Sequence, residues 1–188
     1  FAGVDIVLGP EMRSTGEVMG VSERFSIAFA KSQLAAGAGL PSEGRIFISV
    51  APKSKERIVD LAVRLEKIGY EILATKGTAE ALEKAGVKVE LVKKLQEGHP
   101  NLLDHLEDDR VALIMNTPKG KGARTDEGRI RAAAVAHNVP CLTTLQAAEA
   151  AVKAMEDLRS NGMAVLSLQD RFAQLAAERA AAEQSAAT

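Results

Sequence analysis

The clearest secondary-structure pattern in the sequence lies in RIFISVAPKSKERIVDLAVRLEKIGYEILATKGT, residues 45–78. It opens with a short β-branched run at residues 45–50 and closes with a second run at residues 70–75, both of strand length. The residues between the two runs carry apolar side chains at the spacing of one helix face: Ile58, Leu61, Ala62, Leu65 and Ile68. Ser54 is placed to cap this helix and Gly69 to end it. A strand, a helix and a second strand in this order predict one βα unit of a parallel sheet.

The same alternation continues beyond residue 78. Further strands are expected at residues 87–92, 111–116 and 139–142, further helices at residues 101–107, 126–137 and 145–158, and a short helix capped by Thr78 that ends before Gly86. The run VALIMN at residues 111–116 is apolar throughout, which indicates a central strand buried on both faces. Right-handed crossovers place helices on both sides of such a sheet. The sequence therefore predicts an α/β fold, with a five-stranded parallel sheet in a three-layer α/β/α, Rossmann-like arrangement.

The two ends of the chain depart from this pattern. Residues 9–20 are rich in glycine, and residues 23–34 have the composition of a helix. We expect four parts: an N-terminal part at 1–36, a linker at 37–43, the α/β domain at 44–160, and a C-terminal strand and helical tail at 161–188. In the last part, AVLSL at residues 164–168 is expected to add an edge strand before a helix rich in Ala, Glu and Arg. Because Phe1 and the residues after it resemble the middle of a strand and a loop, we expect the sequence to be a fragment of a longer chain.

The composition of the chain argues against several classes of protein. Of the 188 residues, 46% are hydrophobic and 3% are aromatic, so the core must be aliphatic. The 24 Lys and Arg residues against 25 Asp and Glu residues give a net charge of -1, which argues against nucleic acid or an acidic membrane as partner. No apolar run has the length of a transmembrane helix. The single cysteine, Cys141, excludes a disulfide framework within the chain and a cysteine-based zinc site, and it favours the cytoplasm.

Hydrogen-bond donors follow the predicted strands at the points where the strands end. In doubly wound sheets, ligands bind beyond the carboxyl ends of the strands. These ends carry Lys53, Lys55, Thr75, Lys76, Gly77, Thr78, Lys93, Lys94, Asn116, Thr117, Thr143 and Thr144. The TKGT turn at residues 75–78 combines a glycine, two hydroxyls, a cation and a helix N-terminus, which suits a phosphate group. The alternative is structural, because Thr78 and Thr144 are ordinary capping residues and lysines beside strands are usually solvated.

Other reactive side chains give weaker signals. The three histidines, His99, His105 and His137, lack the spacing of metal ligands, so they are expected on the surface and a metal site is not expected. Asp104 or Asp126 would serve as a general base only if the fold brought it into the pocket. Cys141 lies in an apolar strand, which favours a buried structural thiol over a nucleophile.

The N-terminal string GVDIVLGPEMRSTGEVMG, residues 3–20, resembles the end of the second ATP-grasp half of carbamoyl-phosphate synthase large subunits. The segments that follow resemble the C-terminal regulatory domain of the same family. They are residues 48–82, LVKKLQEG at 91–98, LIMNTPKGK at 113–121 and TTLQAA at 143–148. This resemblance implies a methylglyoxal-synthase-like fold for residues 44–160, and makes residues 1–36 the last part of the carbamoyl-phosphate synthetic domain.

The resemblance also implies a function. Such synthases use two ATP, bicarbonate and glutamine-derived ammonia to make carbamoyl phosphate for pyrimidine and arginine biosynthesis. Their C-terminal domain binds UMP or IMP as effector, and ornithine activates near its border with the synthetase body. The resemblance implies a large subunit whose remaining part lies outside this sequence, a glutaminase small subunit, and an oligomeric enzyme. It also implies that ATP and Mg or Mn bind outside residues 1–188, so this segment is expected to hold no cofactor, metal or catalytic residue of its own.

Carried over by position, the effector site would consist of Lys55, Thr75, Thr78, Lys94, Asn116 and Thr117, with Thr143 on the ornithine side. Two positions depart from some bacterial members, which have Thr in place of Pro118 and Tyr in place of Cys141. The first departure bears on the nucleotide and the second on ornithine.

A different class of function shares the fold. A methylglyoxal-synthase-like lyase acting on dihydroxyacetone phosphate would use the same phosphate loop together with a carboxylate base, and here only Asp126 is available for that role. A nucleotide cyclohydrolase domain has a similar turn but lacks the string at residues 9–20. The sequence therefore favours a regulatory domain over both enzymes.

Overall fold

Five strands form a single sheet in the computed structural model, which describes residues 18–117 and 126–186. The strands are β1 (Arg45–Ser49), β2 (Glu71–Thr75), β3 (Val89–Val92), β4 (Leu113–Asn116) and β5 (Cys141–Leu142). Their order across the sheet is β3-β2-β1-β4-β5, and every neighbouring pair is parallel. The predicted five-stranded parallel sheet is confirmed.

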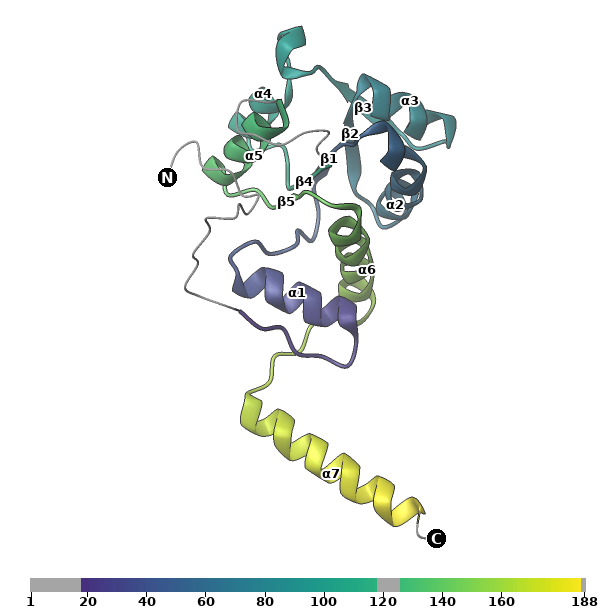
Figure 1. Ribbon diagram of the computed structural model, residues 1–188, viewed down its shortest axis with the longest axis vertical. Helices are drawn as coiled ribbons and strands as arrows, with labels where there is room; N and C mark the ends of the chain where they lie inside the picture. Colours follow the sequence, from purple (N-terminus) through teal and green to yellow (C-terminus); the bar gives the residue numbers. More distant parts are fainter. Residues whose placement is uncertain (1–17, 118–125, 187–188) are drawn as a thin grey trace.

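Helices cover both faces of this sheet, as Figure 1 shows. On one face lie α2 (Lys55–Lys67), α3 (Lys76–Lys84) and α6 (Leu145–Asn161), and on the other lie α4 (Leu102–Glu107) and α5 (Asp126–Ala136). The layers follow from strand geometry, because successive side chains point to opposite faces. In β1, Ile46 and Ile48 pack toward the first group of helices and Phe47 toward the second. The predicted three-layer arrangement is therefore confirmed.

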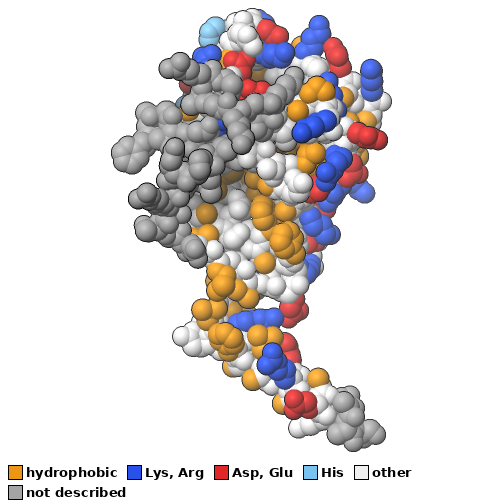
Figure 2. All heavy atoms as spheres, in the orientation of Figure 1, with side chains coloured by type: hydrophobic (Ala, Val, Ile, Leu, Met, Phe, Trp, Pro, Cys, Tyr) orange, Lys and Arg blue, Asp and Glu red, His pale blue; other side chains and the backbone are white. Residues whose placement is uncertain are grey.

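Two helices lie outside the three layers. Helix α1 (Phe25–Ala35) packs against α6, and α7 (Leu168–Ala186) projects away from the body of the molecule (Figure 1). Figure 2 shows apolar side chains gathered where the body meets α7. The exposed apolar side chains of α1 and α7 include Phe25, which is 73% exposed, and Phe172, which is 67% exposed. An apolar surface of this kind is typical of a contact with another protein segment.

Some sequence expectations are wrong. The edge strand at residues 164–168 is absent: residues 162–167 pair with no described strand, and Leu168 already begins α7. The segment lies beside residues 21–31, away from the sheet, so no strand is near enough to bond with it. By contrast, the strand expected at residues 111–116 is confirmed: β4 lies between β1 and β5 and is buried throughout. His105 was expected on the surface and is buried, because α4 turns it toward the core.

The helix starts also differ in detail. Helix α3 begins at Lys76 with Thr75 at the N-cap, so Thr78 lies inside the first turn and is not the cap. Ser54 does occupy the N-cap position of α2, but its side chain makes no capping hydrogen bond. Cys141 is half-buried at the start of β5. No helix in the described ranges is long and apolar enough to cross a membrane. The four-part division of the chain stays a prediction.

Candidate functional site

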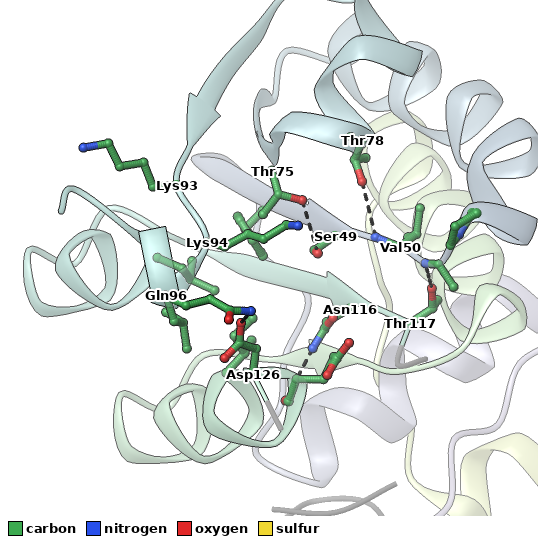
Figure 3. A pocket seen from close by; sticks show the side chains of 18 of the residues that line it. Ser49, Val50, Thr75, Thr78, Lys93, Lys94, Gln96, Asn116, Thr117 and Asp126 are labelled. Carbon is green, nitrogen blue, oxygen red and sulfur yellow. Dashed lines mark hydrogen bonds between the residues drawn. The ribbon is translucent and has the colours of Figure 1, made fainter. Parts of the chain in front are cut away.

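A cavity of about 460 Å³ lies at the carboxyl edge of the sheet. Its walls come from the segments that follow β1, β2, β3 and β4, together with the first turn of α5 (Figure 3). Parallel strands all end at this edge, so the polar residues that follow them converge there. The volume is within the range of small-molecule and cofactor sites.

Hydroxyl groups fix the segment that leaves β1. The Thr78 Oγ1 accepts a hydrogen bond from the backbone N–H of Val50 at 3.4 Å, and the Thr117 Oγ1 accepts one from Ala51 N–H at 3.1 Å. The Ser49 Oγ and Thr75 Oγ1 lie 3.4 Å apart, within hydrogen-bonding distance. Since each of these oxygens accepts or shares a bond with the protein, their positions are set before a ligand arrives, and the O–H groups of Thr78 and Thr117 remain able to donate.

Positive charge gathers on the same side of the cavity. The Nζ of Lys55 lies 3.3 Å from the position that a Cβ on Gly77 would take. Gly77 is in the first turn of α3, where the backbone N–H groups have no partner within the helix. Lys94 points toward Thr75 and Ser49, and Lys93 points away from them (Figure 3). The Lys93 ammonium donates to the His99 carbonyl instead. Two ammonium groups and a helix N-terminus around buried hydroxyls form a site suited to an anion.

Hydrogen-bond acceptors form the opposite wall. Asn116 is 1% exposed, its Nδ2 donates to the Glu127 carbonyl at 3.5 Å, and its Oδ1 has no hydrogen-bond partner among the described residues. The Asp126 carboxylate at the start of α5 accepts a hydrogen bond from Gln96 Nε2 at 2.9 Å. A buried acceptor without a partner is costly, and a ligand donor placed there would satisfy it. The cavity therefore offers donors on one side and acceptors on the other.

The structure brings together six of the seven residues that the sequence singled out. Those lining the cavity are Lys55, Thr75, Thr78, Lys94, Asn116 and Thr117. Thr143 does not line it; this half-buried residue lies between β5 and α6. Pro118 lies outside the described residues. In the described ranges, no group of three His, Cys, Asp or Glu side chains is placed to hold a metal ion.

Two polar residues of the cavity, Ser49 and Gln96, were not singled out from the sequence. Ser49 ends the first strand and Gln96 follows the third, so their positions after strands were a usable signal. Asp126 was considered only as a base that the fold would have to bring in. The structure places it in the wall because α5 begins there, directly after the undescribed residues 118–125.

An ion pair and a hydrogen bond connect α6 to the helices α2 and α1. The Arg64 guanidinium of α2 donates to Glu156 of α6 through Nε at 2.9 Å and Nη2 at 2.7 Å. These hydrogen bonds lower the pKa of Glu156 and raise the pKa of Arg64, in each case against a smaller opposing effect of burial. At the next residue of α6, the Ser26 hydroxyl of α1 donates to Asp157 and is the main cause that lowers the pKa of that carboxyl. Helix α6 is thus bonded to α2 through Glu156 and to α1 through Asp157.

Comparison with known proteins identifies a domain family and similar proteins. Residues 57–143 match the model of the MGS-like domain. The chain is 66% identical over 174 residues to a carbamoyl phosphate synthase large chain from Rhodopirellula baltica, which covers 93% of this chain and 16% of that protein. It is 49% identical over 171 residues to the C-terminal section of the carbamoyl phosphate synthase large chain of Methanopyrus kandleri, covering 90% of this chain and 32% of that protein.

A solved structure is also similar. Methylglyoxal synthase from Elizabethkingia anophelis NUHP1 matches at a TM-score of 0.48 and 18% identity, over 60% of this chain and 79% of that one. The chain spans 16% of the Rhodopirellula relative, so that protein is several times longer. Residues 57–143 therefore belong to the MGS-like domains, within a chain that corresponds to a C-terminal section of carbamoyl phosphate synthase large chains.

Proposed function

We propose that this chain is the allosteric regulatory section of a glutamine-hydrolysing carbamoyl phosphate synthase, and that its cavity binds a nucleotide such as UMP or IMP. The observation that carries the proposal is the grouping of Lys55, Lys94, two buried threonine hydroxyls and the N-terminus of α3 around one cavity. Charge-assisted hydrogen bonds of about 1.5 to 3 kcal/mol each would hold the phosphate. The Asn116 Oδ1 and Thr117 hydroxyl would then face the rest of the nucleotide.

Regulation requires more than binding. The effector must bind two states of the whole enzyme with different affinity, since equal affinity shifts no equilibrium. Couplings of about 1 to 3 kcal/mol are usual between allosteric sites. In this proposal the signal passes from the cavity through α6 to α1, because the ion pair of Arg64 with Glu156 and the bond of Ser26 with Asp157 join these elements. The exposed apolar residues of α1 and α7, including Phe25 and Phe172, support a contact with the remainder of the large chain.

The remaining roles of the whole enzyme belong to the same proposal. Carbamoyl phosphate would form from two ATP, bicarbonate and glutamine-derived ammonia in parts outside residues 1–188, with Mg or Mn and a glutaminase small subunit. The segment itself would be catalytically inactive. Ornithine would act on the side of Thr143, and the enzyme would be an oligomer of the cytoplasm.

A methylglyoxal-forming lyase is the second candidate, and one observation favours it. Asp126 lines the cavity and could reach a bound triose phosphate as a base. Against this candidate, 93% of the chain matches a carbamoyl phosphate synthase large chain at 66% identity. Incubation of the chain with dihydroxyacetone phosphate distinguishes the two: the regulatory proposal expects no methylglyoxal, and its formation would establish the lyase.

The regulatory role is tested in a full-length large chain carrying this sequence as its C-terminal section. Carbamoyl phosphate synthesis is measured against UMP and IMP concentration for the parent protein and for Lys94→Ala. We expect the variant to keep its activity without effector and to lose its response to both nucleotides. Lys84→Ala is the matched control, because Lys84 ends α3 and does not line the cavity. An unchanged response of Lys94→Ala would show that the nucleotide binds elsewhere.

A further inference from the structure

The two walls of the cavity differ in charge, and this difference bears on which phosphate esters it accepts. Figure 3 shows Lys94, Thr75 and Ser49 on one side and Asp126 with Gln96 on the other, with Asn116 on the wall near Asp126. We propose that Asp126 is a specificity-determining residue that selects a monophosphate with free hydroxyl groups at its far end and rejects a ligand with a second phosphate. The inference rests on the proposed function and deepens it.

The position of Asp126 is set by its neighbours. It is the first residue of α5, and Gln96 Nε2 donates to its Oδ2 at 2.9 Å. Glutamine is neutral, so this bond orients the carboxylate and leaves its charge in place. A carboxylate accepts hydrogen bonds through both oxygens, which matches two neighbouring hydroxyl groups of a sugar. It repels a phosphate, which carries about 1.5 to 2 negative charges near neutral pH.

Asn116 also requires a hydrogen-bond donor from the ligand. Its buried Oδ1 is an acceptor without a partner among the described residues, while its Nδ2 is directed to the Glu127 carbonyl. A hydroxyl group can donate to this oxygen, but a phosphate dianion has no proton to donate. Both acceptors on this wall therefore require donors from the ligand, whereas the lysines and the α3 N-terminus on the opposite wall require an acceptor. A ligand that satisfies both walls has one phosphate and a hydroxyl-bearing end.

The test compares uridine 5′-monophosphate, uridine 3′,5′-bisphosphate and inorganic phosphate by isothermal titration calorimetry on the whole chain. We expect the bisphosphate to bind about 10-fold or more weakly than the monophosphate, because like charges placed together at a site are strongly disfavoured. Asp126→Asn, which keeps the size of the side chain, is expected to remove most of that difference and to leave the affinity for inorganic phosphate unchanged. Glu83→Gln removes the same charge from the exposed face of α3 and should keep the parent ratio.

A second measurement needs no variant. The 2′,3′-dideoxy analogue of uridine 5′-monophosphate should bind the parent chain about 10-fold or more weakly, since the buried Asn116 Oδ1 would then stay without a donor and the Asp126 carboxylate would lose its ligand hydroxyl. Equal affinity for the monophosphate and the bisphosphate, or a ratio that Asp126→Asn does not change, would overturn the inference while the nucleotide site stands. Absence of binding by the monophosphate and by inorganic phosphate would overturn the proposed function together with it.

Discussion

Replacing Gly77 with Ala is expected to stabilise the fold and to weaken phosphate binding at the same time. The backbone of Gly77 is helical, in the first turn of α3, where Ala is favoured over Gly by about 0.5 to 1 kcal/mol. For a chain of this size that corresponds to a rise in Tm of about 1 to 4 °C. The new Cβ would lie 3.3 Å from the Nζ of Lys55, closer than most carbon contacts, and would cover the N–H groups that an anion approaches. Loss of one charge-assisted bond of about 1.5 to 3 kcal/mol lowers affinity by about 10- to 150-fold.

The assay for Gly77→Ala combines thermal unfolding with calorimetric titration of UMP. Lys55→Ala and the double variant complete a mutant cycle, which measures whether the two residues act on the same contact. If the added methyl group acts by displacing Lys55, the double variant should bind little more weakly than Lys55→Ala alone. A Tm increase with unchanged UMP affinity would mean that the phosphate lies away from both Gly77 and Lys55, contrary to this prediction.

Three further predictions concern stability. Leu65→Ala removes a fully buried side chain of α2 and should cost about 2 to 5 kcal/mol in the free energy of unfolding, measured by urea denaturation; a cost below about 1 kcal/mol would contradict the packing described. The lowered pKa of Glu156 means that its pairing with Arg64 stabilises the folded state at neutral pH and that this effect is lost as the pH falls from the ordinary glutamate pKa of about 4.3 through the lowered one, so the Tm advantage over Glu156→Gln should shrink with falling pH; an advantage that does not change from neutral to acid pH would exclude the pair as its source. Ser26→Ala should speed hydrogen exchange in α1 by about 10-fold or more and leave β1 unchanged, since the lost bond joins α1 to a charged group on α6; equal protection in both proteins would refute the role of that bond.

The part of the fold that the sequence predicts is the part set by local pattern. Ile46, Phe47 and Ile48 alternate between two faces, and the apolar residues of α2 return every three or four positions, so the strand and helix follow from their own sequence. The absent strand at residues 164–168 shows that local pattern alone does not determine a strand. Its residues have strand composition, but a strand also needs a neighbour with which to bond, and the chain emerges from α6 beside residues 21–31 instead.

The candidate site likewise contains residues whose positions follow from the sequence and residues whose positions depend on tertiary packing. Lys55, Thr75, Thr78 and Lys94 follow strand ends, and parallel strands all end at one edge, so their convergence was predictable. The position of Asp126 in the cavity wall was not predictable, because it depends on where α5 packs against the sheet. That packing is a contact between segments far apart in the chain. The expectation that His105 lies on the surface was wrong for the same reason. Whether a helical position faces solvent or the core depends on the surface against which α4 packs.

Whether the cavity holds the phosphate of a nucleotide is measured by calorimetric titration of UMP into the parent chain, Lys55→Ala and the control Lys84→Ala. We expect saturable binding to the parent, the same affinity for Lys84→Ala, and about a 10- to 150-fold loss of affinity for Lys55→Ala. Binding of UMP to Lys55→Ala with the parent affinity would contradict this expectation.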